Sequence, residues 1–404
     1  MTDGDGAPRG NRSAGARPRS RPGPLTAEQR LLREIEAGRQ ARRQRAILTV
    51  AAVVSALVLV TSGGAWAVTT YVTGHLDRLS VGTSGTPESG PLNILVAGVD
   101  ERSGLTPQQE RELHVGHDVS TNSDTLMLVH VPADHSYLEV VSLPRDSWVN
   151  IPGHGMNKIN AAFGLGGPKL MVQTVAAATG LTINDYIEVN FLGFVKVIDA
   201  LGGVNICLPF AVNDAYSGLD LSAGVHHVDG ITALEFARDR HSFAASDLAR
   251  IDDQQQLMAT VLSKAASTGT LSDPFKLRKV ISSVTSAIQV DQGFNLVSLA
   301  SQLSGLRPQN VAFTTVPLAN LSYQTPTGES AVLWDSGAAS QLFGQIRADQ
   351  RPAAVAPPPR PKPGHRAKSG APARPTAAPR PSPSQATGTA AGGQQKTAAQ
   401  DTCH

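Results

Sequence analysis

An uncharged segment near the N-terminus limits what this chain can fold into. No charged residue occurs between Ala46 and Gly74, and most of the segment is apolar. Its length suffices for one bilayer crossing, which needs roughly 20 residues. A cleaved signal peptide is the alternative, but its apolar core normally has about 7–15 residues and lies closer to the N-terminus. The sequence therefore predicts a transmembrane helix over residues 46–72.

Positive charge lies mainly on one side of this segment. Arg42, Arg43 and Arg45 precede it directly, whereas only Arg78 follows soon after it. Because basic residues concentrate on the cytoplasmic side of a membrane helix, we expect the N-terminus inside the cell and the rest of the chain outside. Residues 1–45 hold eleven arginines, five acids and few large apolar side chains. They are predicted to form a disordered cytoplasmic arm.

The other end of the chain has a different bias. Residues 351–404 contain eleven prolines, eight basic residues and one acid, a composition that predicts a disordered, extended tail. Residues 73–90 are rich in Gly, Ser and Thr and read as a linker, which leaves residues 91–350 as one external domain. Between residues 46 and 350 acids outnumber bases by 27 to 16. Arginines that cluster in such an acidic region point to a bound anion rather than to solubility.

The chain has two cysteines, and neither belongs to a zinc-binding pattern. Cys207 lies in an apolar run and Cys403 lies in the tail. A bridge between them is one option outside the cell. A buried free thiol together with a tail thiol is the favoured state.

Strand and helix patterns alternate along the external domain. Apolar runs of strand length are LNILVAGV, DTLMLVHV, YLEVVSLP, IEVNF, VNICLP and NVAFTTVPLA. Helical spacing occurs over residues 167–180, 191–203, 246–266, 273–288, 294–305 and 339–348. This alternation predicts an α/β fold, a three-layer α/β/α sandwich around a central mixed sheet, preceded by the one transmembrane helix. Ligands of such folds bind at the carboxyl ends of strands, where Asp100, Arg102 and Arg145 fall.

The helix predicted over residues 246–266 carries polar residues on its apolar face. Asp247, Arg250 and Gln254 fall within about 60° of each other, and Met258 and Val261 continue the same stripe. Asp247 could simply complement the helix dipole, and Gln254 could be a satisfied core amide. Arg250 is different, because a cation in the first helical turn opposes the dipole and needs an anionic partner.

Further charged residues suggest what that partner is. Arg238 and Arg240 are two residues apart, so their side chains point the same way in an extended segment. Together with Arg250 they could hold a phosphate or pyrophosphate. The alternative is a pair of surface arginines on a loop. Asp100 follows one predicted strand and Asp124 begins the next, and two carboxylates beside a phosphate are a common way to hold Mg²⁺ (or Mn²⁺). A Gly-rich stretch flanked by Arg145, Lys158 and Asn160 could approach the same anion.

In order along the chain, five blocks resemble the characteristic motifs of the LytR-CpsA-Psr family, over roughly residues 90–265. They are NILVAGVDER, SDTLMLVHV, VVSLPRDSWVNIPGHGMNKINAAFGLGG, YIEVNFLGFVKVIDALGGV and ARDRHSFAASDLARIDDQQQ. The resemblance implies a membrane-anchored phosphotransferase that moves a glycopolymer from a polyprenyl diphosphate carrier to peptidoglycan through a phosphodiester. It also implies an apolar tunnel for the polyprenyl chain.

The resemblance assigns roles to single residues. Asp100 and Asp124 match the metal ligands. The positions that line the pyrophosphate, with the polar residues beside them, are Arg102, Arg145, Lys158, Asn160, Arg238, Arg240, Asp247, Arg250 and Gln254. Arg145, Arg250 and Asp247 are the expected catalytic residues, with Asp247 a candidate acceptor for the hydroxyl proton.

Two departures and two alternatives remain open. The stretch Ser103–Thr121 is longer than in many family members, and Asp253 stands where the family often has arginine. A non-catalytic lipid-binding scaffold or regulator would keep the same fold, and a pyrophosphatase would use the same residues with water as acceptor. No basic recognition helix or nucleic-acid motif occurs in the external domain, so nucleic acid is not an expected partner.

Overall fold

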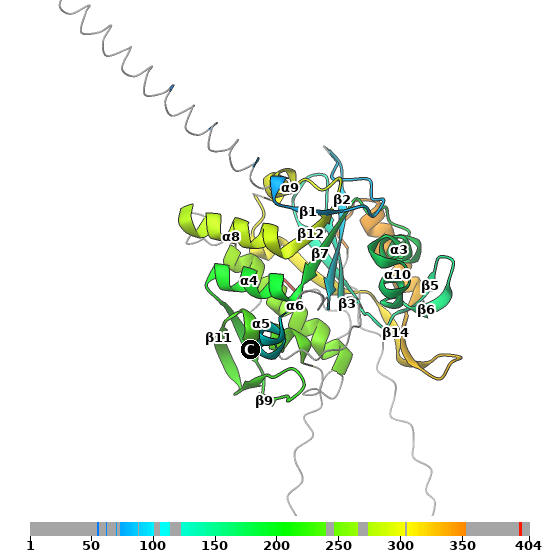
Figure 1. Cartoon of the computed structure of the whole chain (residues 1–404). Helices are drawn as coiled ribbons and strands as arrows, with labels where there is room; N and C mark the ends of the chain where they lie inside the picture. Colours follow the sequence, from blue (N-terminus) through cyan, green and yellow to red (C-terminus); the bar gives the residue numbers. More distant parts are fainter. Residues whose placement is uncertain are drawn as a thin grey trace, which may run out of the picture. The chain divides into compact units, whose positions relative to one another are not determined.

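We analysed a computed structural model of the 404-residue chain (Figure 1). It describes residues 73–87, 89–100, 106–113, 123–239, 246–265, 274–303, 305–352 and 396–397, with Ser55, Ser62 and Thr70. The chain divides into two compact units, Met1–Val68 and Thr69–His404, and the fold below is that of the second. Among the described residues no helix is both long and apolar enough to cross a membrane. Apart from those three isolated positions, the helix predicted over residues 46–72 lies outside the described residues.

A mixed β-sheet forms the centre of this unit and confirms the predicted fold class. Its strand order is β1 (Asp77–Leu79), β12 (Ile288–Asp291), β7 (Asp185–Asn190), β2 (Leu92–Val99), β3 (Ser123–Val131), β4 (Leu138–Leu143), β13 (Val311–Thr315) and β16 (Lys396–Thr397). β2 runs parallel to β7, and β4 runs parallel to β13. β3 is antiparallel to both of its neighbours, β2 and β4.

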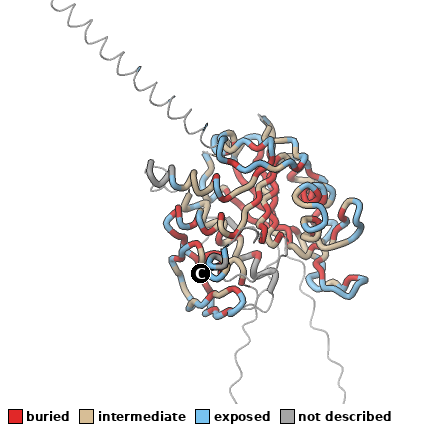
Figure 2. Tube along the Cα trace, viewed as in Figure 1, coloured by how far each residue is buried: buried red, intermediate tan, exposed pale blue. Residues whose placement is uncertain are grey.

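Both faces of the sheet are covered, because successive side chains of a strand point to opposite sides. On one face Leu95 and Leu128 belong to the core beneath α3 (Ala161–Thr179) and α10 (Ser336–Arg347). On the other face Ile94 and Met127 join α6 (Ser246–Ala265), α8 (Pro274–Ala287) and α9 (Leu296–Leu303). Figure 1 shows α3 and α10 on one side of the strands and α8 on the other, and in Figure 2 the buried positions gather along the sheet. Full burial of one such side chain contributes about 1.5–3 kcal/mol.

Local sequence signals set the helix ends. α4 (Phe191–Leu201) begins where the Asn190 side chain accepts a 2.8 Å hydrogen bond from the Gly193 N–H, and it ends at Gly202 in the left-handed region. These are the usual cap residues at the two ends. α3 begins earlier than predicted and bends at Gly166 and Gly167, where the backbone is not helical, directly before Pro168. Proline lacks the N–H that a continuous helix needs, so the bend falls there.

Several short elements were not predicted. The Gly-rich stretch forms a hairpin of β5 (Trp148–Ile151) and β6 (Gly155–Lys158), and Gly153 and Gly155 have positive φ in its turn. The other unpredicted elements are α2 (Pro107–Glu112), β9 (Val212–Asn213), β10 (Asp220–Leu221), β11 (Gly224–Val228), α5 (Gly230–Arg238), η1 (Pro308–Asn310), β14 (Leu318–Gln324) and β15 (Ser330–Trp334). Apart from the seven-residue β14, these strands have two to five residues and are too short to show a clear hydrophobic period. The strand predicted at VNICLP is present as β8 (Val204–Leu208).

One expectation about the cysteines is wrong, and most of the tail lies outside the described residues. Lys396 and Thr397, in the tail expected to lack secondary structure, form β16 and pair with Phe313 and Ala312 on β13. The pairing supplies partners for a strand that would otherwise lie at the sheet edge. Cys207 on β8 is disulfide-bonded rather than a free thiol. The chain has only one other cysteine, Cys403, which lies outside the described residues.

Candidate active site

Strand direction brings distant parts of the sequence to one edge of the sheet. β2 and β7 are parallel, so their last residues, Val99 and Asn190, are neighbours. β3 runs the other way, and its first residue, Ser123, pairs with Val99. The last residue of β4, Leu143, pairs with Leu126 near the start of β3. Asp100, Asp124 and Arg145 are therefore placed at the same edge, as the sequence predicted from the positions of the strand ends.

An ion-paired chain of four side chains follows from this arrangement. Arg145 Nη1 lies 2.6 Å from Asp124 Oδ1, and Arg145 Nε lies 3.4 Å from Asp146 Oδ2. Asp146 Oδ1 lies 3.5 Å from Lys158 Nζ. The Arg145 and Asp124 side chains are 20% and 25% exposed, so solvent still screens the pair and limits its contribution to stability. These ion pairs hold two cations, Arg145 and Lys158, at fixed positions.

Asp146 takes part in these ion pairs, but the sequence did not identify it as a site residue. Its position directly after Arg145 was the available signal, but adjacent residues on a strand point to opposite faces. The strand ends at Leu143, and the turn at Pro144–Ser147 changes the direction of the backbone. Asp146 can then contact both cations, a consequence of the turn.

Backbone hydrogen bonds fix the segment that carries Arg145. The Asn160 N–H donates to the Arg145 carbonyl at 3.1 Å, and the Ile159 N–H donates to the Ser147 carbonyl at 2.8 Å. Ser147 Oγ donates to the Pro144 carbonyl at 2.6 Å. Asn160 is therefore beside Arg145, as predicted, and the end of the β5–β6 hairpin is tied to the turn that holds the cations.

An apolar cavity of about 280 Å³ lies on the α6 side of the sheet. Three predicted site residues line it: Asp124, Arg238 and Gln254. Apart from Thr125 and Asn190, its other walls are apolar and come from β2, β3, β7, α4, α5, α6 and α8. They include Val96, Met127, Phe191, Phe194, Ile198, Leu234, Leu257, Met258, Val261 and Ile288. An apolar cavity with a few polar groups is the usual form of a small-molecule site, here one suited to a long hydrocarbon with an anionic end.

The described part of the stripe predicted on α6 borders this cavity. Gln254, Met258 and Val261 all line it, which confirms that they share one helix face. The Gln254 amide also donates to the Ala237 carbonyl at 3.4 Å, so it satisfies the last turn of α5 while it borders the cavity. The two interpretations of Gln254 given by the sequence are therefore compatible.

Arg238 is positioned at the end of α5. Its Nη1 donates to the Leu113 carbonyl at 3.0 Å, and its guanidinium carbon lies 5.3 Å from the centre of the Phe191 ring. A cation at a helix C-terminus is also favoured by the helix dipole. These contacts hold a positive charge in the wall of an otherwise apolar cavity.

Other predicted site residues fall partly or wholly outside the described part of the chain. Arg102 and Arg240 lie outside it, as does most of the stretch Ser103–Thr121. Asp247 and Arg250 belong to α6, but their side chains are not described. The grouping of Arg238 with Arg240 and Arg250 therefore stays a prediction.

The residues present suit a divalent metal ion. Among the described residues no cluster of three or more His, Cys, Asp or Glu side chains could hold a metal ion. Asp100, which is 8% exposed, and Asp124 both lie at this edge of the sheet, and Asp124 also lines the cavity. Mg²⁺ prefers oxygen ligands and is often held by only one or two carboxylates together with substrate phosphates. The donor set fits that mode of binding and does not fit an all-protein metal cage.

Fold and site together define an α/β protein with an apolar cavity bordered by cations and a carboxylate at one edge of a mixed sheet. The model of the LytR_cpsA_psr family matches residues 69–343. The chain belongs to this LytR-CpsA-Psr family, as the sequence blocks predicted.

Curated relatives agree with this assignment, and a solved structure shares the fold. The cell wall biosynthesis protein LcpA of Corynebacterium glutamicum is 32% identical over 346 residues, which cover 76% of this chain and 66% of LcpA. The polyisoprenyl-teichoic acid–peptidoglycan teichoic acid transferase TagU of Oceanobacillus iheyensis is 35% identical over 227 residues, covering 54% of this chain and 65% of TagU. The structure of TagT bound to LI-WTA has a TM-score of 0.51 at 22% identity and covers 67% of this chain and 98% of TagT. This last likeness concerns the fold alone.

Proposed function

We propose that this protein is a membrane-anchored phosphotransferase that attaches a polyprenyl-diphosphate-linked anionic glycopolymer to peptidoglycan. The proposal rests on one observation: an apolar cavity and a group of charged side chains lie in the same site. An apolar cavity suits the polyprenyl chain, and Asp124 and Arg238 in its wall, with Arg145 beside Asp124, suit the diphosphate. Membership of the LytR-CpsA-Psr family and the transferase name of its relative TagU support the same activity.

The reaction is a phosphoryl transfer. A sugar hydroxyl of peptidoglycan forms a new bond to the polymer-bearing phosphorus, the bond from that phosphorus to the bridging oxygen breaks, and polyprenyl phosphate leaves. The hydroxyl proton passes to a base, for which Asp247 is the candidate. Because such a transition state spreads negative charge over the phosphoryl oxygens, catalysis depends mainly on positioning and charge neutralisation. Arg145, Lys158 and Arg238 would supply cations for that purpose.

A divalent ion would add to the same effect. Asp100 and Asp124 would hold Mg²⁺ or Mn²⁺, and the ion would neutralise charge on the diphosphate. The ion pair with Arg145 would also position the Asp124 carboxylate at the sheet edge for the metal ion. The proposed localisation is the cell membrane, with the N-terminus in the cytoplasm and the catalytic domain outside.

The test uses the full chain in detergent with a polyprenyl-diphosphate-linked sugar, peptidoglycan oligomers and Mg²⁺. Phosphodiester-linked product should form, and EDTA should abolish it. Arg145→Ala should lower the rate by about 10²–10³-fold, the usual cost of one preorganised charge-stabilising group. Arg307→Ala, which removes an exposed arginine in the segment before β13, is the matched control.

Other outcomes would replace the proposal. An Arg145→Ala rate equal to that of the control would show that this cation has no role in transfer. Tight lipid binding without product would favour the scaffold. Release of phosphate without attachment to peptidoglycan would favour a hydrolase.

A further inference from the structure

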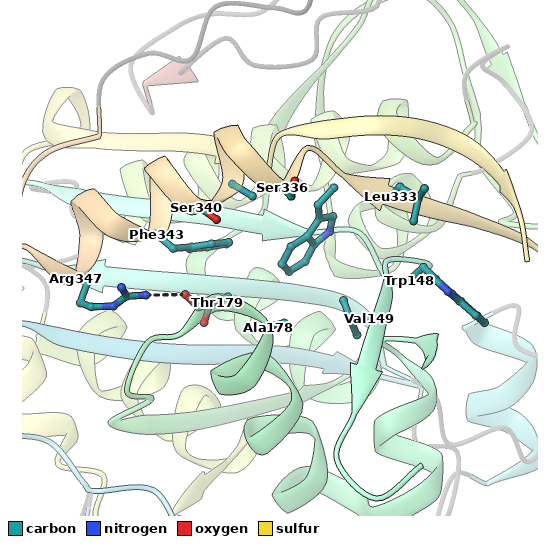
Figure 3. Close-up of a pocket in the computed structure, with 11 residues that line it drawn as sticks. Trp148, Val149, Ala178, Thr179, Leu333, Ser336, Ser340, Phe343 and Arg347 are labelled. Atoms are coloured by element: carbon teal, nitrogen blue, oxygen red, sulfur yellow. Dashed lines mark hydrogen bonds between the residues drawn. The ribbon is translucent and has the colours of Figure 1, made fainter. Parts of the chain in front are cut away.

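A second pocket, of about 340 Å³, lies on the opposite face of the sheet from the apolar cavity. Its walls come from β5, β15, α3 and α10, and it is drawn in Figure 3. Val149, Ala339 and Phe343 in its lining belong to the core on the α3–α10 side. Val96 and Met127, which line the apolar cavity, pack on the other side. The sheet therefore separates the two spaces.

Aromatic rings form one part of this pocket. Trp334 is half-buried, and its ring centre lies 5.9 Å from that of Phe343. The Trp334 Nε1–H donates to Ser147 Oγ at 2.7 Å, so the indole is held in one orientation. Trp148 is also half-buried, and its ring centre lies 6.5 Å from that of Tyr323. Rings with accessible faces suit the C–H-rich faces of sugar rings, which are apolar but rigid.

Polar groups form the other part. Ser336, Ser340, Phe343 and Arg347 are spaced four, three and four residues apart, which places them on one face of α10. Ser336, Ser340 and Arg347 are exposed, and Figure 3 shows them along the helix above Val149 and Ala178. Hydroxyls and a guanidinium beside aromatic rings suit a ligand with many hydroxyls and an acidic group, rather than a plain hydrocarbon.

Arg347 is fixed in place. Its Nε donates to the Gly180 carbonyl at 3.0 Å, and its Nη2 donates to the Thr179 carbonyl at 3.2 Å. These bonds use two of the five N–H groups of a guanidinium. The others can contact a carboxylate without a new side-chain arrangement.

The pocket is connected to the turn that carries Arg145. Ser147 accepts the Trp334 hydrogen bond and donates to the Pro144 carbonyl, and a backbone bridge joins Ser147 to Val332 on β15. Trp148 lies three residues after Arg145, and three residues span at most about 10 Å. One sugar ring or two would bridge that distance.

From these observations we propose that this pocket is a glycan subsite and that it binds the acceptor, a carboxylate-bearing peptidoglycan strand. The inference rests on the proposed function, which places the polyprenyl chain in the cavity on the other face. In phosphoryl transfer the attacking and leaving oxygens are roughly in line. If the polyprenyl phosphate leaves toward one face of the sheet, the acceptor hydroxyl arrives from the other, where the pocket lies.

The first test measures binding without catalysis. The full chain in detergent is titrated with a soluble peptidoglycan tetrasaccharide that carries its peptides, and the fluorescence of Trp148 and Trp334 reports occupancy. Ser340→Arg fills the pocket from an exposed position, and Gln341→Arg places the same charge on the neighbouring exposed position of α10. We expect a saturable signal that Ser340→Arg weakens about tenfold or more and that Gln341→Arg leaves nearly unchanged. Equal binding by both variants would overturn the subsite.

The second test measures transfer. Gln341→Arg, which lies outside the pocket lining, should leave the kcat and the hydrolysis of the lipid-linked donor at the wild-type level. Ser340→Arg should raise the KM for the peptidoglycan acceptor about tenfold or more. If the variant instead raises the KM for the donor, or if only a soluble fragment of the donor polymer gives the fluorescence change, the assignment to the acceptor is wrong. Saturable peptidoglycan binding by a wild-type protein with no transfer activity would support the subsite while overturning the proposed function.

Discussion

Asp185 is a buried acid whose replacement should stabilise the protein at neutral pH. Its side chain is fully buried at the start of β7. Oδ2 accepts a 2.6 Å hydrogen bond from Thr86 Oγ1, and Oδ1 has no hydrogen-bond partner among the described residues. Desolvation, together with the nearby Asp291 carboxylate, raises the pKa of Asp185 from 3.8 to about 6, although the Thr86 bond opposes the rise.

The sign and size of the effect follow from this pKa. Between pH 3.8 and about 6 the folded protein binds more protons at Asp185 than the unfolded chain does. The free energy of unfolding therefore decreases as the pH rises through this window and stays reduced above it. The pKa of Asp185 differs by about two units between the folded and unfolded states. At about 1.4 kcal/mol per unit, this lowers the free energy of unfolding at neutral pH by roughly 3 kcal/mol. For a domain of this size that equals a change in Tm of roughly 6–12 °C.

Asp185→Asn removes the charge and keeps an oxygen that can accept from Thr86. Thermal unfolding of the full chain in detergent, followed by tryptophan fluorescence, should show a Tm several degrees above wild type at pH 7.5. The gain should disappear near pH 4, where wild-type Asp185 is protonated. Asp220→Asn, which neutralises an exposed acid on β10, is the control. A gain of the same size at both pH values, or no gain at pH 7.5, would refute the argument.

Two further substitutions test the packing around the site. Gln255 on α6 is 4% exposed and donates to Ser142 Oγ at 2.9 Å. Gln255→Ala should lower the free energy of unfolding by about 1–3 kcal/mol in urea titrations, and a change below about 0.5 kcal/mol would show that the bond between α6 and the sheet is unimportant. Gly193→Ala would place a methyl group 2.4 Å from the Ala287 carbonyl oxygen where α4 meets α8. Gly193→Ala should lower the free energy of unfolding by about 1–3 kcal/mol. Gly344→Ala, in the open middle of α10, should raise it by about 0.5–1 kcal/mol. Equal effects of the two substitutions would contradict the close approach of α4 to α8.

Long periodic elements could be predicted from the sequence, and short ones could not. The apolar runs of β2, β3 and β4 and the spacing in α4 and α8 extend over enough residues to show their period, and their ends lie close to the predicted ones. The hairpin over residues 148–158 includes the start of the Gly-rich stretch at 152–167, for which the sequence predicted a loop. Its strands have four residues each, and their pairing depends on the turn at Gly153 and Gly155.

The candidate site shows the same division. Asp100, Asp124 and Arg145 were identified because polar residues directly after or before a buried strand lie at a sheet edge. Asp146 was missed, because its contact with Lys158 depends on how the backbone turns after β4. Gln254, Met258 and Val261 on α6 were predicted correctly to share one face, and that face borders an apolar cavity rather than a filled core.

By itself the sequence determined the fold class, the family, the alternation of strands and helices and the strand ends that carry charge. These properties depend on hydrophobic period and on residues close together in the chain. Tertiary structure alone decided which charges pair and that Gln254, Met258 and Val261 border a cavity. It also decided that Trp334, Phe343 and Arg347 line one pocket with Trp148 on the other face of the sheet. Such contacts join residues far apart in the sequence, and their positions depend on strand order and helix packing, which no local pattern encodes.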